Sequence, residues 1–361
     1  MLMVLLTREE QFRKLFPKAP AFRFRQMEEA LFSPVFKSFA DISNMSLAMR
    51  ELLTKEISWL AIKEVQVLES AKRDTFKAVV EMVDQKRVET VLMKNARAQW
   101  TVCVSSQVGC AMACTFCATG KMGFTRNLIA DEIVDQVRFW NIFLRERPKL
   151  AQRISNVVFM GMGEPLANYE NVKETLSVLL AHTDMGMTRI TVSTVGLIPM
   201  LRKLLADPKW PAVRLAVSLH SADAVTRQVM MPSSFPAFLN DLAVWTQEYF
   251  EKFDSRRRHL TFEYVMLSKI NDTEMHAQAL ITFARKVGNV RINLIPYNFI
   301  PQTSKRSAEQ AKNVYRGSLP GDFAHFEKTL EEAGVTVTRR RTMGDDIAAA
   351  CGQLIVDKSE S

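Results

Sequence analysis

The chain has 361 residues, 47% of them hydrophobic, which is enough apolar material for one large core and a smaller domain. No apolar run approaches the roughly 18 residues of a membrane span, and no basic segment precedes the apolar residues 1–6, which argues against a secretory signal. We therefore expect a cytoplasmic protein. Its net charge of +9 favours either a polyanionic partner or a solvated basic surface, and composition leaves both open.

The first part of the chain is predicted to be mainly helical. Apolar residues recur at helical spacing in three segments, and two short apolar segments after them suit a β-hairpin around residues 84–87. The predicted helices are 22–32, 45–53 and 57–68, and the predicted hairpin strands are 78–83 and 88–93. We interpret residues 1–95 as an N-terminal helical accessory domain with a short β patch.

From residue 101 onward, β-rich runs alternate with helical patterns, which is typical of parallel βαβ units. The predicted strands are 101–105, 154–160, 189–193, 213–219, 260–267 and 290–296, and the predicted helices are 131–144, 169–181, 198–206, 237–253 and 273–287. This pattern predicts an α/β fold, a partial (β/α)6 barrel over residues 96–300, with its chemistry at the carboxyl ends of the strands. Residues 301–361 form a predicted extension with a helix at 323–333, a strand at 335–338 and a loop holding Cys351.

Three of the five cysteines lie within eight residues, in a CxxxCxxC motif formed by Cys110, Cys114 and Cys117. Three thiolates on a short loop are able to ligate three irons of a four-iron cluster and leave the fourth iron open. Two alternatives remain at this point: a zinc site completed by a distant ligand such as His220, and three buried free thiols. The odd number of cysteines and their clustering disfavour a disulfide framework.

Longer motifs extend around and beyond these cysteines. The sequence CVSSQVGCAMACTFCATGKMGFTRNL at residues 103–128 resembles the signature of the RlmN/Cfr family of radical S-adenosylmethionine (SAM) RNA adenine methyltransferases. The similarity continues in order through FMGMGEPLAN at 159–168, STVGLIP at 193–199, SLHS at 218–221, INLIPYN at 292–298 and GDDIAAACGQL at 344–354. The resemblance implies one 4Fe-4S cluster on the three cysteines and SAM as both methyl donor and radical source, two per turnover.

The resemblance also implies a SAM site on residues that lie at or near the ends of predicted strands. Glycines at 161 and 163 would let a ligand approach the backbone, and Glu164 could accept hydrogen bonds from the ammonium group of SAM. Taken singly, such a strand-end residue is more often a satisfied structural group than a ligand. The implied set is Gly163, Glu164, Ser193, Ser218, Leu219, His220 and Asn298.

Cys103 and Cys351 are the cysteines outside the cluster motif, and sequence spacing cannot bring them together. The resemblance implies that they meet: Cys351 takes a methyl group from one SAM, and a second SAM yields a 5′-deoxyadenosyl radical that activates this methyl group. The activated carbon then joins the adenine, and Cys103 resolves the adduct through a disulfide with Cys351. Glu89 matches the family's proton acceptor. The alternative is two unrelated free thiols and a surface carboxylate.

The implied substrate is 23S ribosomal RNA, with transfer RNA as an open second substrate. Glu164-Pro165 and the IPYN sequence at 295–298 resemble the branch that methylates carbon 2 of adenosine, rather than the antibiotic-resistance branch that methylates carbon 8. The target base must leave its stack to reach the site. Candidate phosphate contacts, each alternatively a solvated face, are the runs 256–258 and 339–341 and the N-terminal residues Arg13, Lys14, Lys18, Arg23 and Arg25.

We further expect a monomer that receives electrons from an external donor such as flavodoxin. Two other classes stay open on the sequence: a radical-SAM enzyme with a different substrate, which would not need Cys351, and an RNA-binding protein with a structural metal, which would not cleave SAM. Residues 299–320 depart from the family's substrate-proximal loop and leave activity on transfer RNA undecided.

Overall fold

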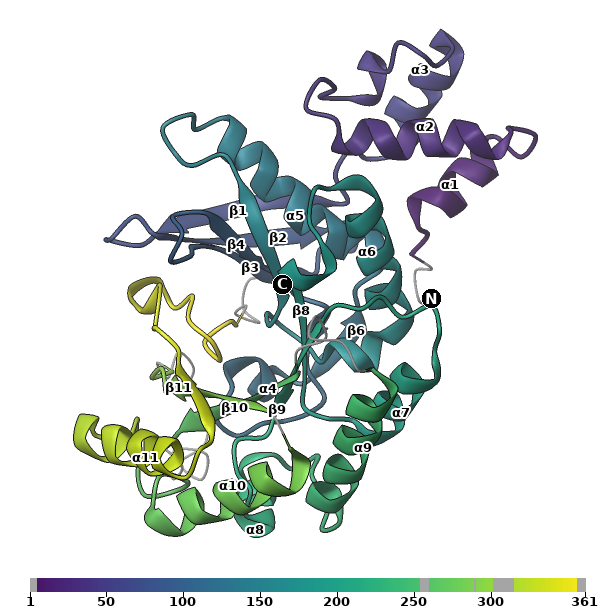
Figure 1. The fold of residues 1–361 in the computed structure, drawn as a ribbon. Coiled ribbons are helices and arrows are strands. Elements are labelled where there is room, and N and C mark those ends of the chain that lie inside the picture. Colours follow the sequence, from purple (N-terminus) through teal and green to yellow (C-terminus); the bar gives the residue numbers. More distant parts are fainter. Residues whose placement is uncertain (1–4, 254–259, 289, 301–314, 356–361) are drawn as a thin grey trace.

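A ten-stranded sheet runs through the molecule in the order β1-β2-β3-β4-β7-β8-β9-β10-β11-β12 (Figure 1). The computed structural model describes residues 5–253, 260–288, 290–300 and 315–355. Neighbours from β1 to β4 pair antiparallel, and neighbours from β4 to β12 pair parallel. The strands are β1 Ile62–Glu69, β2 Thr75–Met82, β3 Arg87–Lys94, β4 Trp100–Cys103, β7 Ile154–Phe159, β8 Ile190–Thr194, β9 Arg214–Ser218, β10 Leu260–Met266, β11 Arg291–Pro296 and β12 Thr336–Arg339.

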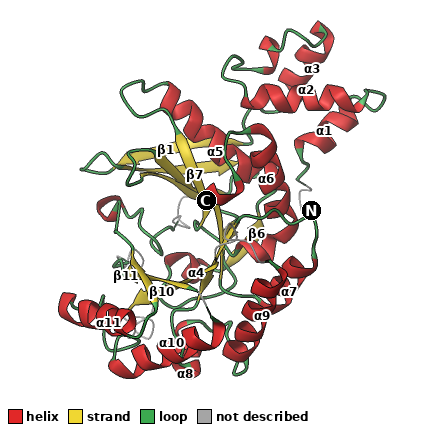
Figure 2. Ribbon diagram, in the orientation of Figure 1, coloured by secondary structure: helices red, strands yellow, loops and turns green. Residues whose placement is uncertain are grey.

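The parallel strands curve into a partial barrel whose outer face is covered by helices (Figure 2). All six predicted strands and the helices between them are confirmed, with boundaries that differ by two residues at most, and β12 extends the parallel series. The helices are α5 Ala130–Arg145, α6 Tyr169–His182, α7 Ile198–Ala206, α8 Ala224–Met230, α9 Phe238–Lys252, α10 Glu274–Val287 and α11 Pro320–Glu332. A second sheet, β5 Gln107–Gly109 with β6 Phe124–Asn127, flanks the short α4 Ala118–Met122.

The helix predicted at 57–68 is wrong, because most of this segment forms β1. Its register pairs Ile62 with Met82 and Glu69 with Phe76 of β2. Apolar residues at helical spacing also include Val65 and Val67, which are β-branched and suit a strand. Pairing with the open edge of the β2–β3 hairpin therefore overrode the local helical pattern. The hairpin itself is confirmed, and β3 joins it to β4 of the barrel.

Helices α1 Arg8–Leu15, α2 Ala21–Phe32 and α3 Leu47–Glu56 form a small bundle at the N-terminal end of the chain (Figure 1). The bundle has its own apolar core, in which Phe12, Met27 and Leu53 are almost completely buried. Thr7 begins α1 with a capping box, and Ser46 caps α3. The predicted helices at 22–32 and 45–53 are thereby confirmed.

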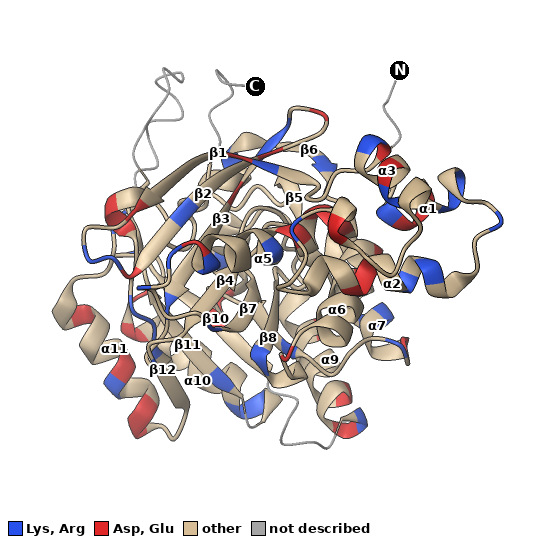
Figure 3. Cartoon of the chain, turned by 90° about the horizontal axis from the view of Figure 1, so that it is seen from above, with Lys and Arg blue, Asp and Glu red and all other residues tan. Residues whose placement is uncertain are grey.

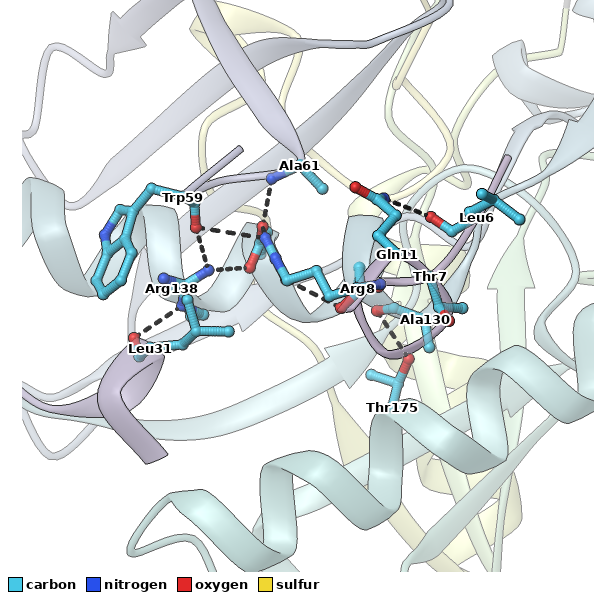
Figure 4. A network of polar contacts seen from close by, with 12 residues as sticks. Leu6, Thr7, Arg8, Gln11, Leu31, Trp59, Ala61, Ala130, Arg138 and Thr175 are labelled. Carbon is cyan, nitrogen blue, oxygen red and sulfur yellow. Dashed lines mark hydrogen bonds and ion pairs between the residues drawn. The ribbon is translucent and has the colours of Figure 1, made fainter. Parts of the chain in front are cut away.

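A buried charged cluster fastens this bundle to α5 (Figure 4). Arg8 reaches from α1 to form an ion pair with Asp135, and Arg138 pairs with Asp135 at 2.5 Å. Arg138 also donates hydrogen bonds to the carbonyl oxygens of Leu31 and Trp59, each at 2.9 Å. Burial would raise the pKa of Asp135, but Arg138 and Arg8 hold it below its ordinary value.

Lys and Arg residues lie over the N-terminal helices and along the strands and loops of the barrel, interspersed with acidic residues (Figure 3). In the N-terminal bundle, Arg13 pairs with Glu9 at 2.5 Å. Lys14, Lys18 and Arg25 are exposed. In the described part of the chain, no helix combines the length and the apolar character needed to cross a bilayer.

Candidate active site

The cluster motif lies on the loop between β5 and α4, at the carboxyl end of the barrel's first strand. Gly109 precedes Cys110 with φ of +74°, and a Cβ there would lie 1.8 Å from the carbonyl oxygen of Gly123. The Cys110 amide donates to that same oxygen at 2.9 Å. Only glycine allows the loop to fold back this closely, and the fold brings Cys110 toward Cys114 and Cys117.

The three cysteines border one cavity that opens at this end of the barrel. Burial raises the pKa of Cys110 to about 12, and burial together with the other two thiols also raises the pKa of Cys114. Thiols so placed become stable thiolates only beside positive charge, which a cationic cluster supplies. The three thiols line one shared cavity. The donor set and its tight loop therefore fit an iron–sulfur cluster with three protein ligands.

Several residues of the predicted SAM set line this same cavity. They are Gly163, Glu164, Ser193, Ser218 and His220. Gly163 has φ of +100°, and a Cβ there would lie 2.5 Å from Cβ of Gln107, so this close approach also requires glycine. The chain thus brings the ends of β7, β8 and β9 against the cysteine loop.

Glu164 is 2% exposed, and both of its carboxylate oxygens accept backbone hydrogen bonds, from Leu166 at 2.9 Å and Val195 at 2.8 Å. Burial raises its pKa to about 7, against the opposing effect of these donors and of Thr194. Burial also lowers the pKa of His220 to about 3, with a further contribution from Arg227. His220 is therefore a neutral ring, and its Nδ1 accepts a hydrogen bond from the Val265 amide at 3.0 Å.

Two residues of the predicted SAM set lie elsewhere. The side chain of Leu219 is completely buried in the main core, and Leu219 does not line the cavity. Asn298 donates from Nδ2 to the carbonyl oxygen of Cys351 at 3.2 Å, and its Oδ1 accepts from Thr342 at 3.0 Å. In this structure Asn298 therefore holds the C-terminal segment.

A second cavity, of about 810 Å³, contains both remaining cysteines in its wall. Cys103 ends β4 and is 5% exposed, whereas Cys351 is exposed on the loop after β12. Burial and the neighbouring Cys351 raise the pKa of Cys103 to about 12. Cys351 also borders the first cavity, so it lies between the cluster motif and Cys103. Two thiols some 250 residues apart in sequence are thereby brought together.

This geometry agrees with what comparison with known proteins shows. Residues 104–277 match the radical SAM superfamily. The chain is 39% identical over 94% of its length to the dual-specificity RNA methyltransferase RlmN of Desulfotalea psychrophila, covering 90% of that protein, and 39% identical over 96% of its length to a probable RlmN of Christiangramia forsetii, covering 94%. The chain belongs to the RlmN family.

A solved relative of this RlmN-family chain has the same fold. The crystal structure of a radical SAM methyltransferase from Sphaerobacter thermophilus superposes with a TM-score of 0.83 at 33% identity, covering 97% of each chain. The fold prediction is thus confirmed as an α/β radical-SAM fold with N-terminal helices. Members of this superfamily use a 4Fe-4S cluster and SAM, and the cavity of the RlmN-family chain offers thiols for the first and strand-end groups for the second.

Glu89, the predicted proton acceptor of the RlmN-family site, is 3% exposed on β3 and is paired with Lys77 of β2 at 2.8 Å. Its second carboxylate oxygen accepts from the Ile355 amide at 2.8 Å, and Lys77 donates to the carbonyl oxygen of Ala348 at 3.2 Å. Burial raises the pKa of Glu89, and Lys77 opposes that shift. The ion pair therefore contacts the C-terminal segment on both sides of Cys351.

Sequence reasoning on this RlmN-family chain missed Lys77 and treated Arg340 only as part of a basic run. The alternation of β2 places Lys77 diagonal to Glu89 of β3, and this cross-strand charge pair was the available signal. The run 339–341 divides in the structure, because Arg339 pairs with Glu327 and Arg340 turns toward Cys351. The run 256–258 and residues 301–314 of the atypical loop lie outside the described residues.

Proposed function

We propose that this protein methylates carbon 2 of an adenosine in 23S ribosomal RNA, and of transfer RNA as a second substrate, with Cys351 as the methyl carrier. One observation supports this most directly: Cys351 borders both the cavity of the cluster motif and the cavity that contains Cys103. A methyl carrier must reach both the cavity where it receives the methyl group and the cavity where it transfers that group to RNA, and Cys351 borders both. A radical-SAM enzyme without a methyl carrier would have no use for such a cysteine.

The residues divide the chemistry between the two cavities. Cys110, Cys114 and Cys117 would hold the 4Fe-4S cluster, which when bound supplies the electron for reductive SAM cleavage. Cys351 accepts the methyl group of one SAM, and a second SAM serves as radical source, so each turnover uses two. Electrons come from an external donor such as flavodoxin, and the thiols need the reducing conditions of the cytoplasm.

Cys103 completes the proposed reaction once the methyl carbon has joined the adenine. Its thiolate attacks the Cys351 sulfur, so that an S–S bond forms while the bond from that sulfur to the RNA-linked carbon breaks. The carbon keeps the electron pair and takes up a proton, which leaves a methyl group on the base. Before that attack, Glu89 would take the proton that leaves carbon 2, after the C-terminal segment has withdrawn from its carboxylate, and the unpaired electron of the adduct would return to the oxidised cluster.

The second cavity has the charge expected of an RNA-binding surface. Among the described residues that line it, six are basic and one, Asp74, is acidic; the basic residues are Lys72, Lys94, Arg189, Arg214, Arg340 and Arg341. Burial and the like charges of Arg189 and Arg291 lower the pKa of Arg214, and a bound phosphate would relieve this repulsion. We assign this cavity to the unstacked adenosine and its flanking phosphates.

We also propose the domain division of the sequence: an accessory RNA-binding region at 1–95, the barrel at 96–300 and a C-terminal extension at 301–361, acting as a monomer. Exposed Lys14, Lys18 and Arg25 support the accessory role because the structure pairs none of the three with an acidic residue within its described part. The bundle would contact RNA away from the reacting base.

The methyl-carrier assignment is tested by mass spectrometry of the Cys351 peptide from anaerobically purified protein. We expect a fraction carrying the mass of one added methyl group, and none in a variant with Cys110, Cys114 and Cys117 all replaced by alanine. Nucleoside analysis of treated ribosomal RNA should give 2-methyladenosine. A product methylated at carbon 8 would contradict the carbon-2 proposal and would assign the protein to the antibiotic-resistance branch of the family.

The resolving role of Cys103 is tested by a pair of variants. Cys103→Ala should still methylate Cys351 and attack RNA, and should then stall with RNA crosslinked to the protein. Cys351→Ala should never crosslink, because it has no methyl carrier. A denaturing gel with and without ribonuclease shows the shifted band. A shifted band from Cys351→Ala would overturn the carrier assignment, and no band from either variant would place Cys103 before radical addition.

A further inference from the structure

Arg340 follows the last strand, β12, and its side chain turns into the space between the two cavities. Its amide donates to the carbonyl oxygen of Leu294 at 2.9 Å, which continues the pairing of β12 with β11 by one residue. The neighbouring Arg339 points the other way, over the ring of Phe323 at 4.1 Å and toward Glu327. Strand alternation thus separates two adjacent arginines onto opposite faces.

The guanidinium of Arg340 contacts the sulfur of Cys351. One terminal nitrogen lies 3.6 Å from Cys351 Sγ, and the other lies 3.3 Å from Met160 Sδ. The Nε atom lies 3.7 Å from a carboxylate oxygen of Glu263 on β10. These contacts hold the charged plane of Arg340 against the exposed cysteine from the side of the barrel.

Glu263 explains why a cation is stable at this position. Its side chain is 4% exposed, and the oxygen that faces Arg340 accepts no hydrogen bond within the described residues. The other oxygen accepts from Asn293 at 2.7 Å. The nearby negative charge of Glu263 raises the pKa of Arg340, and the two thiols Cys351 and Cys103 add to that shift. Arg340 therefore keeps its charge at the sulfur.

Arg340 differs in charge from the other titratable groups near Cys351. Cys103 from β4 and Glu263 from β10 both carry negative charge when ionised, so each disfavours a second negative charge on the Cys351 sulfur. Arg340, from the segment after β12, is the cation in contact with that sulfur. The same arginine favours the charged form of Cys103, against the burial of that thiol.

We propose that Arg340 is a catalytic residue that stabilises the Cys351 thiolate while its sulfur takes up the methyl group. This inference rests on the function proposed above and deepens it. The thiol proton leaves to water, which reaches the exposed Cys351. The thiolate pair forms the new sulfur–carbon bond, and the bond from the methyl group to the SAM sulfonium breaks with its pair on the departing S-adenosylhomocysteine.

The contact between Arg340 and Cys351 should weaken once Cys351 is methylated. Methylated Cys351 is a neutral thioether and no longer attracts the guanidinium, so Arg340 retains Glu263 and releases the carrier. The loop is then held at Cys351 by the backbone hydrogen bond from Asn298. Arg340 is left free to stabilise the Cys103 thiolate when that cysteine attacks the adduct.

The test compares Arg340→Met, which removes the charge at similar length, with Arg340→Lys, which keeps it. The matched control is Arg339→Met, which removes the adjacent charge from the opposite face. Full-length protein is pulsed with iodoacetamide across a pH series, and unmethylated Cys351 peptide is followed by mass spectrometry, because thiolate is the reactive form. We expect alkylation of Cys351 at neutral pH to be up to about tenfold slower in Arg340→Met than in wild type, as for loss of one adjacent positive charge. Arg340→Lys and Arg339→Met should stay near wild type.

A second readout is the rate at which methyl-labelled SAM transfers its label to Cys351 in anaerobically reconstituted protein. We expect this rate to fall by roughly tenfold at neutral pH in Arg340→Met and to recover at higher pH, which a structural defect would not do. An unchanged alkylation rate of Cys351 in Arg340→Met would overturn the inference. Absence of label from Cys351 in the wild type would instead overturn the proposed function, and the alkylation series would still decide the role of Arg340.

Discussion

Both ends of the chain dock on the barrel through buried ion pairs, but the two docks differ in what their charges contact. At the N-terminal end, Arg8 and Arg138 pair with Asp135, and Arg8 also pairs with Asp131 at 2.9 Å. The groups that contact these two arginines lie on the helices α2 and α5 or in the segment just before β1. At the C-terminal end, Lys77 and Glu89 pair with each other on β2 and β3, and their hydrogen bonds to residues 344–355 go to backbone groups of Ala348 and Ile355.

The cost of separating each end from the rest of the molecule depends on what its buried charges contact. Withdrawal of the N-terminal bundle would remove Arg8 from Asp135 and the carbonyl oxygen of Leu31 from Arg138. Buried charges would lose their partners, so this separation has a high cost in free energy. Withdrawal of the C-terminal segment would leave the Lys77–Glu89 pair intact, and water is able to replace the two backbone hydrogen bonds that this pair makes to the segment. We call the first contact the closed dock, because its ion pairs join the bundle to α5. We call the second the open dock, because its ion pair would survive separation of the segment with Cys351.

The largest expected effect is that of Asp135→Ala, which leaves Arg8 and Arg138 buried without their shared partner. We expect the free energy of unfolding to fall by about 3–5 kcal/mol, the usual loss when a buried ion pair is broken. Urea unfolding measures it. The control Glu9→Ala removes an exposed pair with Arg13 and should change stability by less than about 0.5 kcal/mol. Equal effects of the two changes would contradict the closed dock.

A smaller effect is expected from Lys77→Met in the open dock. Glu89 loses its cation, but burial already favours its neutral form, so it is able to protonate, and the loss should be about 1–3 kcal/mol. Hydrogen exchange should become faster in residues 344–355 and stay unchanged in α1 to α3. Faster exchange in the N-terminal bundle as well would show that the two docks are coupled, against this comparison.

The barrel and its cluster motif were predictable from sequence because their signals are local. β-rich runs and helical periods fixed seven parallel strands to within two residues, and CxxxCxxC placed three thiols on one loop. The family resemblance supplied the pairing of Cys103 with Cys351, which no spacing rule provides. The structure places both in one cavity.

The two docks were not predictable, because their bonds join distant positions. Lys77 and Ala348 lie 271 residues apart, and Arg8 and Asp135 lie 127 apart. A lysine in a strand and an arginine near the N-terminus look like solvated residues until the partner element is packed against them. β1 was mistaken for a helix for a related reason, since its strand partner decides its conformation.

The buried carboxyl group of Glu89 makes the stability of the protein depend on pH. Burial raises the pKa of folded Glu89 above its ordinary value of 4.5, so the native state binds more protons than the unfolded state between those two values. Wild type should therefore lose stability relative to Glu89→Gln as pH rises through this window, by about 1.4 kcal/mol for each pH unit that the window spans. Urea unfolding of both proteins from pH 4 upward measures the difference. A difference that grew in favour of wild type with pH would show instead that Lys77 dominates over burial.

The smallest expected effect is on RNA binding by the N-terminal helical bundle, which the closed dock fastens to α5. Lys18 is exposed at the turn between α1 and α2, and Lys18→Gln removes one candidate phosphate contact without touching either ion-pair cluster. Stability should be unchanged, while RNA affinity falls a few-fold and the slope of log affinity against log salt decreases by about 0.7–0.9, the value for one lost phosphate contact. Filter binding over a salt series measures both quantities. The control Lys328→Gln neutralises an exposed lysine on α11 that pairs with Glu332, and should leave the slope as it is. If Lys18→Gln also leaves the slope unchanged, the N-terminal bundle is fastened to the barrel for a reason other than RNA contact at this turn, and the basic cavity around Cys103 carries the binding.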